Sequence, residues 1–106
     1  TDRETSVGAF NYAIDYIETN FPRAYIVLIT PPRTMSNGNS FVKTAADDII
    51  KIANNRNLPV ADLFNKIVPN ERTASTIIAS DGLHYTDVGN ERIAGVVIGA
   101  TLSVMY

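Results

Sequence analysis

The sequence of 106 residues contains no cysteine and a single histidine. The absence of cysteine excludes a disulfide framework, a thiol nucleophile and any metal site built on thiolates. No apolar run approaches the roughly 20 residues that a helix needs to span a bilayer. With six glycines and five prolines, the chain has the composition of an ordinary globular protein. Its length allows one domain at most.

Clustered positive charge is also missing. The nine Lys and Arg residues are scattered without a run or a stripe, and eleven Asp and Glu residues leave a formal net charge of −2. Nucleic-acid binding requires clustered cations that neutralise phosphates, so we expect no nucleic-acid partner. The first five residues, Thr1 to Thr5, are polar and contain neither an initiating Met nor the apolar core of a signal peptide. We therefore expect this sequence to be a processed or excised piece.

Apolar periodicity predicts helices that alternate with strands. Spacings of three and four between apolar residues indicate amphipathic helices over residues 5–20, over residues 41–53 with Ser40 as the preferred cap, and from Thr86 onward. The last helix contains Gly89, Gly95 and Gly99, which we expect to allow close approach of a neighbouring element.

Two apolar runs predict strands. The continuous run over residues 24–30 is typical of a strand buried on both faces, and residues 58–64 read as a short second strand. Residues 65–80 are ambiguous between helical turns and loop. Strands alternating with helices predict parallel pairing in a layered α/β fold. Because sheets normally carry more than two strands, we expect residues 1–106 to be the C-terminal portion of a single domain.

The chemistry-bearing residues gather in loops. In a doubly wound sheet, functional groups lie beyond the carboxyl ends of the strands, which points to residues 31–40 and 80–86. In the second loop, Asp81 precedes His84 by one turn of chain. A carboxylate that accepts a hydrogen bond from one ring nitrogen fixes the histidine tautomer, stabilises the imidazolium and frees the other nitrogen as a general base. The same Asp-x-x-His spacing also arises by chance and in helix caps. Asp81, His84 and Asp87 lack the ligand count of a usual metal site, so we expect neither a metal nor a cofactor.

The residues after His84 carry a family resemblance. The block Asp-Gly-Leu-His-Tyr-Thr-Asp-Val-Gly-Asn-Glu-Arg-Ile-Ala, residues 81–94, resembles the final sequence block of the SGNH (GDSL) hydrolases. In that family an Asp-x-x-His, often followed by Pro and then Thr or Ser, precedes a Gly and the last helix. Here Tyr85 stands where Pro is commoner. Upstream, residues 25–32 look like the family strand that ends in a Pro-bearing loop, and Val60-Ala61-Asp62-Leu63 looks like its next strand with an Asp.

The resemblance implies an ester-cleaving enzyme with a three-layer α/β/α, flavodoxin-like parallel sheet, of which this chain holds the C-terminal half. It implies that His84 is the general base and later the acid, that Asp81 orients it, and that the substrate is an ester such as an acylated carbohydrate or lipid. It also implies a secreted or periplasmic protein. Asp62 matches a family position to which we assign a structural role.

The family's nucleophilic block is absent. In the SGNH family the nucleophile is the Ser of an N-terminal Gly-Asp-Ser block, and a Gly and an Asn from two further blocks complete the oxyanion donors. The serines present here match no such motif: Ser6, Ser36, Ser40, Ser75, Ser80 and Ser103. We therefore expect association with an N-terminal segment or a companion chain that carries the nucleophile, and we expect the isolated chain to be inactive.

Alternatives remain at this point. Arg33, Asn37 and Asn39 are candidate substrate-binding residues, although a solvated polar loop explains them as well. Asp87 is expected to stabilise the N-terminus of the last helix electrostatically. The second hypothesis is a non-catalytic α/β binding or assembly module that keeps the loop as a fold relic. The third hypothesis is a flavodoxin-like domain that binds a phosphorylated ligand. The lack of a Gly-rich phosphate loop after a strand counts against it.

Overall fold

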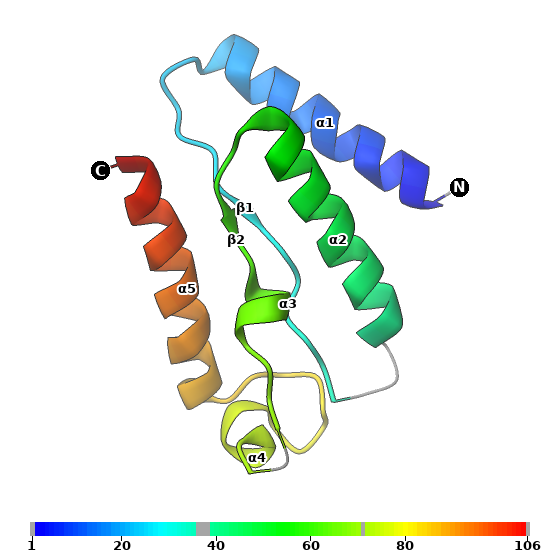
Figure 1. The fold of residues 1–106 in the computed structure, drawn as a ribbon, viewed down its shortest axis with the longest axis vertical. Coiled ribbons are helices and arrows are strands. Elements are labelled where there is room, and N and C mark those ends of the chain that lie inside the picture. Colours follow the sequence, from blue (N-terminus) through cyan, green and yellow to red (C-terminus); the bar gives the residue numbers. More distant parts are fainter. Residues whose placement is uncertain (1, 36–38, 71, 106) are drawn as a thin grey trace.

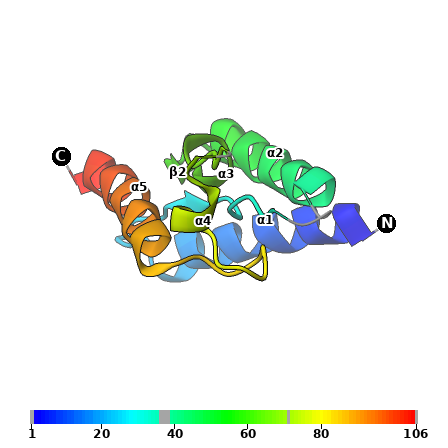
Figure 2. The same cartoon turned by 90° about the horizontal axis from the view of Figure 1, so that it is seen from below.

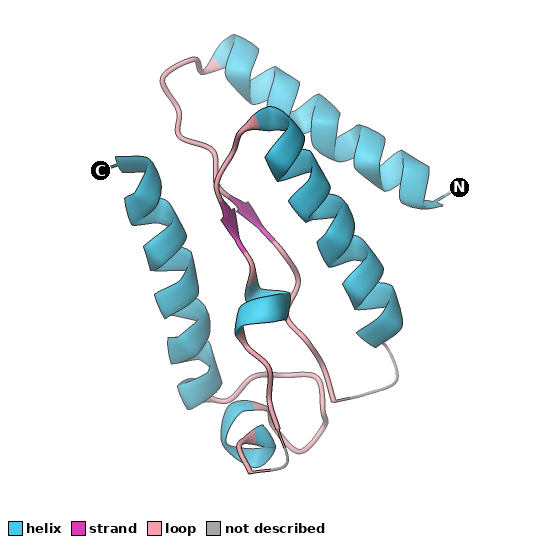
Figure 3. Cartoon of the chain, viewed as in Figure 1, coloured by secondary structure: helices cyan, strands magenta, loops and turns pink. Residues whose placement is uncertain are grey.

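The computed structural model describes residues 2–35, 39–70 and 72–105, with side chains from residue 5 onward. It is mostly helical, with a two-stranded parallel sheet between the helices (Figure 1, Figure 3). In chain order the elements are α1 (Asp2–Asn20), β1 (Leu28–Ile29), α2 (Asn39–Arg56), β2 (Val60–Ala61), α3 (Leu63–Lys66), α4 (Ala74–Ile77) and α5 (Asp87–Met105).

The expected alternation of helices and parallel strands is confirmed. Leu28 pairs with Val60 and Ile29 with Ala61. The ladder continues through Leu28 N–H, which donates to the Pro59 carbonyl at 3.0 Å, and Thr30 N–H, which donates to the Ala61 carbonyl at 3.1 Å. Both strands are shorter than the apolar runs that predicted them. Within the described residues β1 is paired along one edge only, so most of the run over residues 24–30 forms no ladder.

The prediction of a second strand over residues 58–64 is wrong at its C-terminal end, because β2 ends at Ala61 and α3 begins at Leu63. Asp62 caps the short helix α3, where its carboxylate accepts hydrogen bonds from Asn65 N–H at 3.2 Å and from Asn65 Nδ2 at 2.8 Å. The Thr30 hydroxyl donates to the same carboxylate at 3.3 Å and accepts from Phe64 N–H at 3.1 Å. An Asp in the N-cap position starts a helix in this way because it satisfies a free backbone donor. The structural role expected for Asp62 is thus confirmed.

Two apolar cores hold the helices against the strands. Ile14 of α1, Leu28 of β1, and Ile52 and Ala53 of α2 form the first core. The second core joins α3, α4 and α5, and comprises Leu63, Ile67, Ile77 and Ile78 with Tyr85, Ile93, Val96 and Val97 packed against it. Figure 2 shows α1 and α2 on one side of the strands and α5 on the other. Helices therefore cover both faces of the small sheet.

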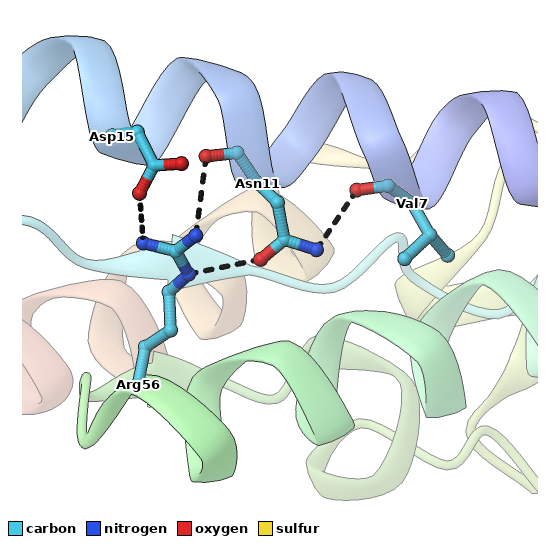
Figure 4. Close-up of polar contacts among 4 residues, drawn as sticks. All are labelled: Val7, Asn11, Asp15 and Arg56. Carbon is cyan, nitrogen blue, oxygen red and sulfur yellow. Dashed lines mark hydrogen bonds and ion pairs between the residues drawn. The ribbon is translucent and has the colours of Figure 1, made fainter.

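A polar clamp at the end of α2 fastens it to α1 (Figure 4). Arg56 Nε donates to Asn11 Oδ1 at 2.9 Å, and a guanidinium Nη donates to the Asn11 carbonyl at 3.3 Å. The other Nη donates to the Asp15 carboxylate at 2.7 Å. This hydrogen bond holds the pKa of Asp15 below its ordinary value and raises that of Arg56. Asn11 in turn donates to the Val7 carbonyl at 3.1 Å, so the clamp extends along α1.

Two expectations about helix positions need correction. α2 begins at Asn39, so Ser40 lies inside its first turn and not at the expected cap. Gly95 and Gly99 have no neighbouring atom within 4 Å of the position a Cβ would take, so the expected close approach at these two glycines is wrong. Both glycines border open space. The close approach occurs at Gly89 alone among the three.

Several large apolar side chains are left uncovered. Ile29 of β1 is 44% exposed, and Ile98, Leu102 and Met105 form an exposed row on α5. Phe10 in α1 and Phe21 just after it are also exposed, by 36% and 58%. A row of exposed apolar side chains such as the one on α5 is typical of a surface that contacts another segment or molecule. In the described part of the chain, no helix has the length and apolar character needed to cross a membrane.

Candidate active site

Asp81 and His84 lie on a tightly closed loop between α4 and α5. An antiparallel bridge between Ile78 and Tyr85 closes its base. Inside it, Ala79 N–H donates to the His84 carbonyl at 2.8 Å, and Gly82 N–H donates to the Ala79 carbonyl at 2.9 Å. Gly82 has a φ of 74°, in the left-handed region that glycine adopts without strain. The loop therefore has a backbone scaffold of its own.

The three-residue spacing brings the carboxylate onto the imidazole. Asp81 Oδ1 accepts hydrogen bonds from Leu83 N–H at 2.9 Å and from His84 N–H at 3.0 Å. These two bonds turn the carboxylate back toward its own loop, and Asp81 Oδ2 is hydrogen-bonded to His84 Nδ1. Asp81 thus binds the backbone with one oxygen and orients the imidazole ring with the other.

The pair shifts both ionisation equilibria in the directions that a general base requires. The hydrogen bond to His84, helped by the Leu83 and His84 N–H donors, holds the pKa of Asp81 far below its ordinary value. The same hydrogen bond and the negative charge of Asp81 raise the pKa of His84 above 6.5. The His84 side chain is 82% exposed. Among the described residues, none hydrogen-bonds its second ring nitrogen, so Nε2 is free to exchange a proton with a ligand.

The start of α5 fixes the loop on its other side. Thr86 Oγ1 accepts from Gly89 N–H at 3.1 Å, which caps α5 as expected, and Thr86 N–H donates to the Ile77 carbonyl at 2.9 Å. A Cβ added at Gly89 would lie 2.2 Å from the Ile77 carbonyl oxygen and 2.9 Å from Tyr85 Cδ2. Only glycine permits this approach. The glycine that follows the Asp-x-x-His sequence therefore serves to dock the last helix beneath the loop.

The structure brings the two candidate loops together. Met35 N–H donates to the Gly82 carbonyl at 2.8 Å, and the Tyr85 hydroxyl donates to the Arg33 carbonyl at 2.7 Å. Burial raises the pKa of the Tyr85 hydroxyl further above neutrality, so the hydroxyl is protonated and donates this hydrogen bond. Sequence reasoning missed this role for Tyr85. The one available signal was the replacement of the commoner Pro by a residue with a hydroxyl.

The candidate substrate-binding residues have contacts within the chain. Arg33 Nε donates to the Phe64 carbonyl at 2.6 Å, and its guanidinium lies 4.0 Å from the centre of the Phe64 ring. The Asn39 side chain accepts from Thr34 N–H at 2.8 Å and donates to the Thr34 carbonyl at 2.7 Å. These contacts hold the loop that follows β1 in place. Asn37 lies outside the described residues. Substrate contact by Arg33, Asn37 or Asn39 stays a prediction.

A small hollow opens beside the loop. It has a volume of about 290 Å³ and is lined by Met35, Ala74, Ser75, Ile78, Ala79, Ser80 and Gly82. None of these side chains is charged. Over the described ranges, no three or more His, Asp or Glu side chains group where they could hold a metal ion. None of the described serines hydrogen-bonds His84.

Comparison with known proteins bears on the fold. No protein-family model matches the sequence, and no curated protein matches it either. Among solved structures, the esterase domain of the ZfL2-1 ORF1 protein from the zebrafish ZfL2-1 retrotransposon superposes with a TM-score of 0.82 at 20% sequence identity. The match covers 97% of this chain. The chain has the fold of part of an esterase domain. It spans 61% of that neighbour, and at this identity the likeness shows the fold alone.

Proposed function

We propose that this chain is the C-terminal part of a serine esterase of the SGNH type, in which Asp81 orients His84 as the general base and acid. The observation that carries the proposal is the hydrogen bond between Asp81 Oδ2 and His84 Nδ1, made on an exposed loop. The likeness in fold to an esterase domain supports it. The departure at Tyr85 does not count against it, because Tyr85 ties the loop in place.

The proposed reaction follows from the free Nε2 of His84. Nε2 takes the proton of a serine hydroxyl while the serine oxygen attacks the ester carbonyl, and the imidazolium then gives that proton to the departing alcohol. Water, deprotonated by the same nitrogen, next hydrolyses the acyl-enzyme and releases the acid and the serine. Asp81 stays ionised throughout and stabilises the imidazolium. The depressed pKa of Asp81 suits that role.

The serine and the oxyanion donors come, in this proposal, from a preceding segment or a companion chain. The handedness of strand connections favours one position for that segment. α1 and α2 lie on the same side of the sheet, and connections between parallel strands are right-handed. A strand that precedes α1 would therefore pair with the free edge of β1, on the side away from β2. There it would extend the sheet toward the three-layer α/β/α fold and help to cover Ile29.

The hollow beside the loop supports an ester with a small, uncharged acyl group, such as an acetylated carbohydrate or a short-chain lipid ester. Its volume of about 290 Å³ and its uncharged lining accommodate a few carbons and would leave a carboxylate or an ammonium group without a partner. Met35 and Gly82, which line it, come from the two loops that the backbone hydrogen bond joins.

Hydrolysis of an activated acetate ester by the full-length protein tests the proposal. His84→Ala is expected to lower kcat/KM by about 10²-fold or more, because a positioned general base contributes that much. Lys51→Ala, on the exposed surface of α2, is the matched control and should leave the rate unchanged. Activity that survives His84→Ala would instead favour the non-catalytic module. Rapid, His84-dependent hydrolysis by residues 1–106 alone would refute the proposal that the nucleophile lies outside these residues.

A further inference from the structure

A second, larger hollow lies along α5, apart from the Asp81/His84 loop. Its volume is about 790 Å³, within the range of roughly 300–1,000 Å³ typical of small-molecule sites. One wall is α5, and the other runs from β2 through the end of α3 to α4. The lining residues are Val60, Lys66, Ile67, Val68, Asn70 and Thr73, with Ile77, Arg92, Gly95, Val96, Gly99, Ala100 and Ser103. None of them belongs to the catalytic loop.

The charge of this groove is opposite to that of the chain. Among the described residues, the charged ones that line it are Lys66 and Arg92, and no described Asp or Glu does, although the whole chain carries a net charge of −2. Within the described residues, neither cation forms an ion pair. Ile67, Ile77 and Val96 supply an apolar floor, and Val68 is 55% exposed at its margin. The groove therefore combines two unpaired cations with an apolar surface.

The shape of the groove suits a chain-like ligand. Its α5 wall runs from Arg92 to Ser103 through residues one turn apart, a length of about 16 Å at 1.5 Å per residue. Small side chains form most of that wall, and nothing lies within 4 Å of the Cβ positions of Gly95 and Gly99. The result is an open trough with one cation, Arg92, at the end nearest the start of α5.

The groove lies away from the edge of the sheet at which the proposed preceding strand would pair. It borders β2, whereas the handedness of the strand connections directs any preceding strand to the opposite edge, beside β1.

We propose that this groove binds an amphiphilic carboxylate, a saturated chain of about twelve carbons whose carboxylate pairs with Arg92 and Lys66. The tail lies along Val96, Gly99 and Ala100. The carboxylate gains charge-assisted hydrogen bonds from Arg92 and attraction from Lys66 on the opposite wall, and the tail covers the half-buried side chains of Val96 and Ala100. Binding requires neither His84 nor a nucleophile, so it stands independently of the proposed esterase activity.

Amide chemical-shift titration of the ¹⁵N-labelled protein with laurate tests the site. Saturable shifts are expected at Gly95, Gly99 and Val96, while His84 stays unshifted. Acetate, with the same head group and no tail, and dodecyltrimethylammonium, with the same tail and the opposite charge, should each bind at least tenfold more weakly. Equal binding of the cationic amphiphile, or shifts confined to other surfaces, would overturn the proposal.

Two variants separate the contributions of charge and shape. Lys66→Gln/Arg92→Gln should raise the Kd for laurate about tenfold, whereas Lys51→Gln/Arg23→Gln, with the same change in net charge on exposed positions elsewhere, should leave it unchanged. Gly99→Leu should abolish binding because the leucine side chain would fill the trough. The substitution should not disturb the fold, because the Gly99 position borders open space. Thr101→Leu, exposed on α5 outside the groove, is its control. Undiminished laurate binding by either groove variant would show that the ligand binds elsewhere.

Discussion

The Asp81 carboxylate has a structural and a chemical role in one side chain. One oxygen accepts from the N–H groups of Leu83 and His84, and the other contacts the imidazole. The turn that the first oxygen stabilises is what brings the ring within reach of the second. Replacement of Asp81 is therefore expected to change both the ionisation of His84 and the conformation of the loop. Asn keeps the acceptor for the backbone N–H groups, removes the charge, and places an NH2 donor where Oδ2 faces His84 Nδ1.

The first prediction concerns the ionisation of His84. Because Asp81 stabilises the imidazolium, the pKa of His84, measured by NMR of the ring protons, should lie above 6.5 and fall in Asp81→Asn. If His84 is the base, kcat/KM of the complete enzyme should decline as the pH falls through that raised pKa. The inflection should move to lower pH in Asp81→Asn. Identical His84 titrations in the two proteins would contradict the assigned pair.

The same shifts set the sign of the pH dependence of stability. A histidine with a raised pKa contributes stability that is present below pH 6.5 and lost as the pH rises through the raised value. An aspartate with a lowered pKa contributes stability that is present above its ordinary value of 3.8 and lost as the pH falls through the lowered value. Since both groups are exposed, solvent weakens the two contributions.

The second prediction concerns the hydroxyl of Tyr85. Tyr85→Phe keeps the ring against the second core and removes the hydrogen bond to the Arg33 carbonyl, so it should lower the free energy of unfolding by about 1 kcal/mol. Denaturant titration measures that change. Hydrogen exchange at the Met35 amide should also quicken, because this amide bonds to the same loop. Tyr25→Phe, at a 70% exposed side chain, is the matched control and should do neither.

Local and distant contacts differ in how far the sequence predicts them. The hydrogen bond between Asp81 and His84 spans three residues and follows from the spacing alone. Tyr85 and Arg33 are 52 residues apart, and their bond depends on how the loop after β1 returns to the loop before α5. Periodicity carries no information about that return.

At the scale of elements, the docking of α5 depends on one glycine. Gly89→Ala should lower the free energy of unfolding by roughly 1–3 kcal/mol, because its Cβ would meet the Ile77 carbonyl oxygen at 2.2 Å and force the helix to shift. Gly95→Ala, in the same helix, should raise it by up to about 1 kcal/mol, because Ala favours helix and the position borders open space. Denaturant unfolding of both variants measures the difference. Equal changes in the free energy of unfolding for Gly89→Ala and Gly95→Ala would contradict the close packing of α5 at Gly89.

The helices were easier to predict than the strands. Periodic apolar residues located α1, α2 and α5 because each helix packs a stripe against the cores. β-Rich runs overestimated both strands, since a run becomes a strand only where a partner backbone is present. Residues 58–64 also contain Asp62, whose capping bond to Asn65 turns the chain into α3. The sequence contains that capping signal, but the apolar residues around it favour extended structure.

At the scale of the whole molecule, the described part of the chain leaves one sheet edge and several apolar side chains uncovered. One edge of β1 has no partner among the described residues, and Ile29 is exposed beside it. The fold matches 61% of an esterase domain. The expectation of a partial domain came from the small number of strands and from the absent nucleophilic block. It remains a proposal, and the proposed docking edge follows from the positions of α1 and α2.

The most direct test maps the reactive serine. The full-length protein is treated with a fluorophosphonate, which phosphonylates activated serines, and the adduct is located by mass spectrometry of its peptides. We expect one adduct, on a serine outside residues 1–106, that forms at least about 10²-fold more slowly in His84→Ala. An adduct on a serine of this chain, such as Ser80, or labelling at an equal rate without His84, would contradict it.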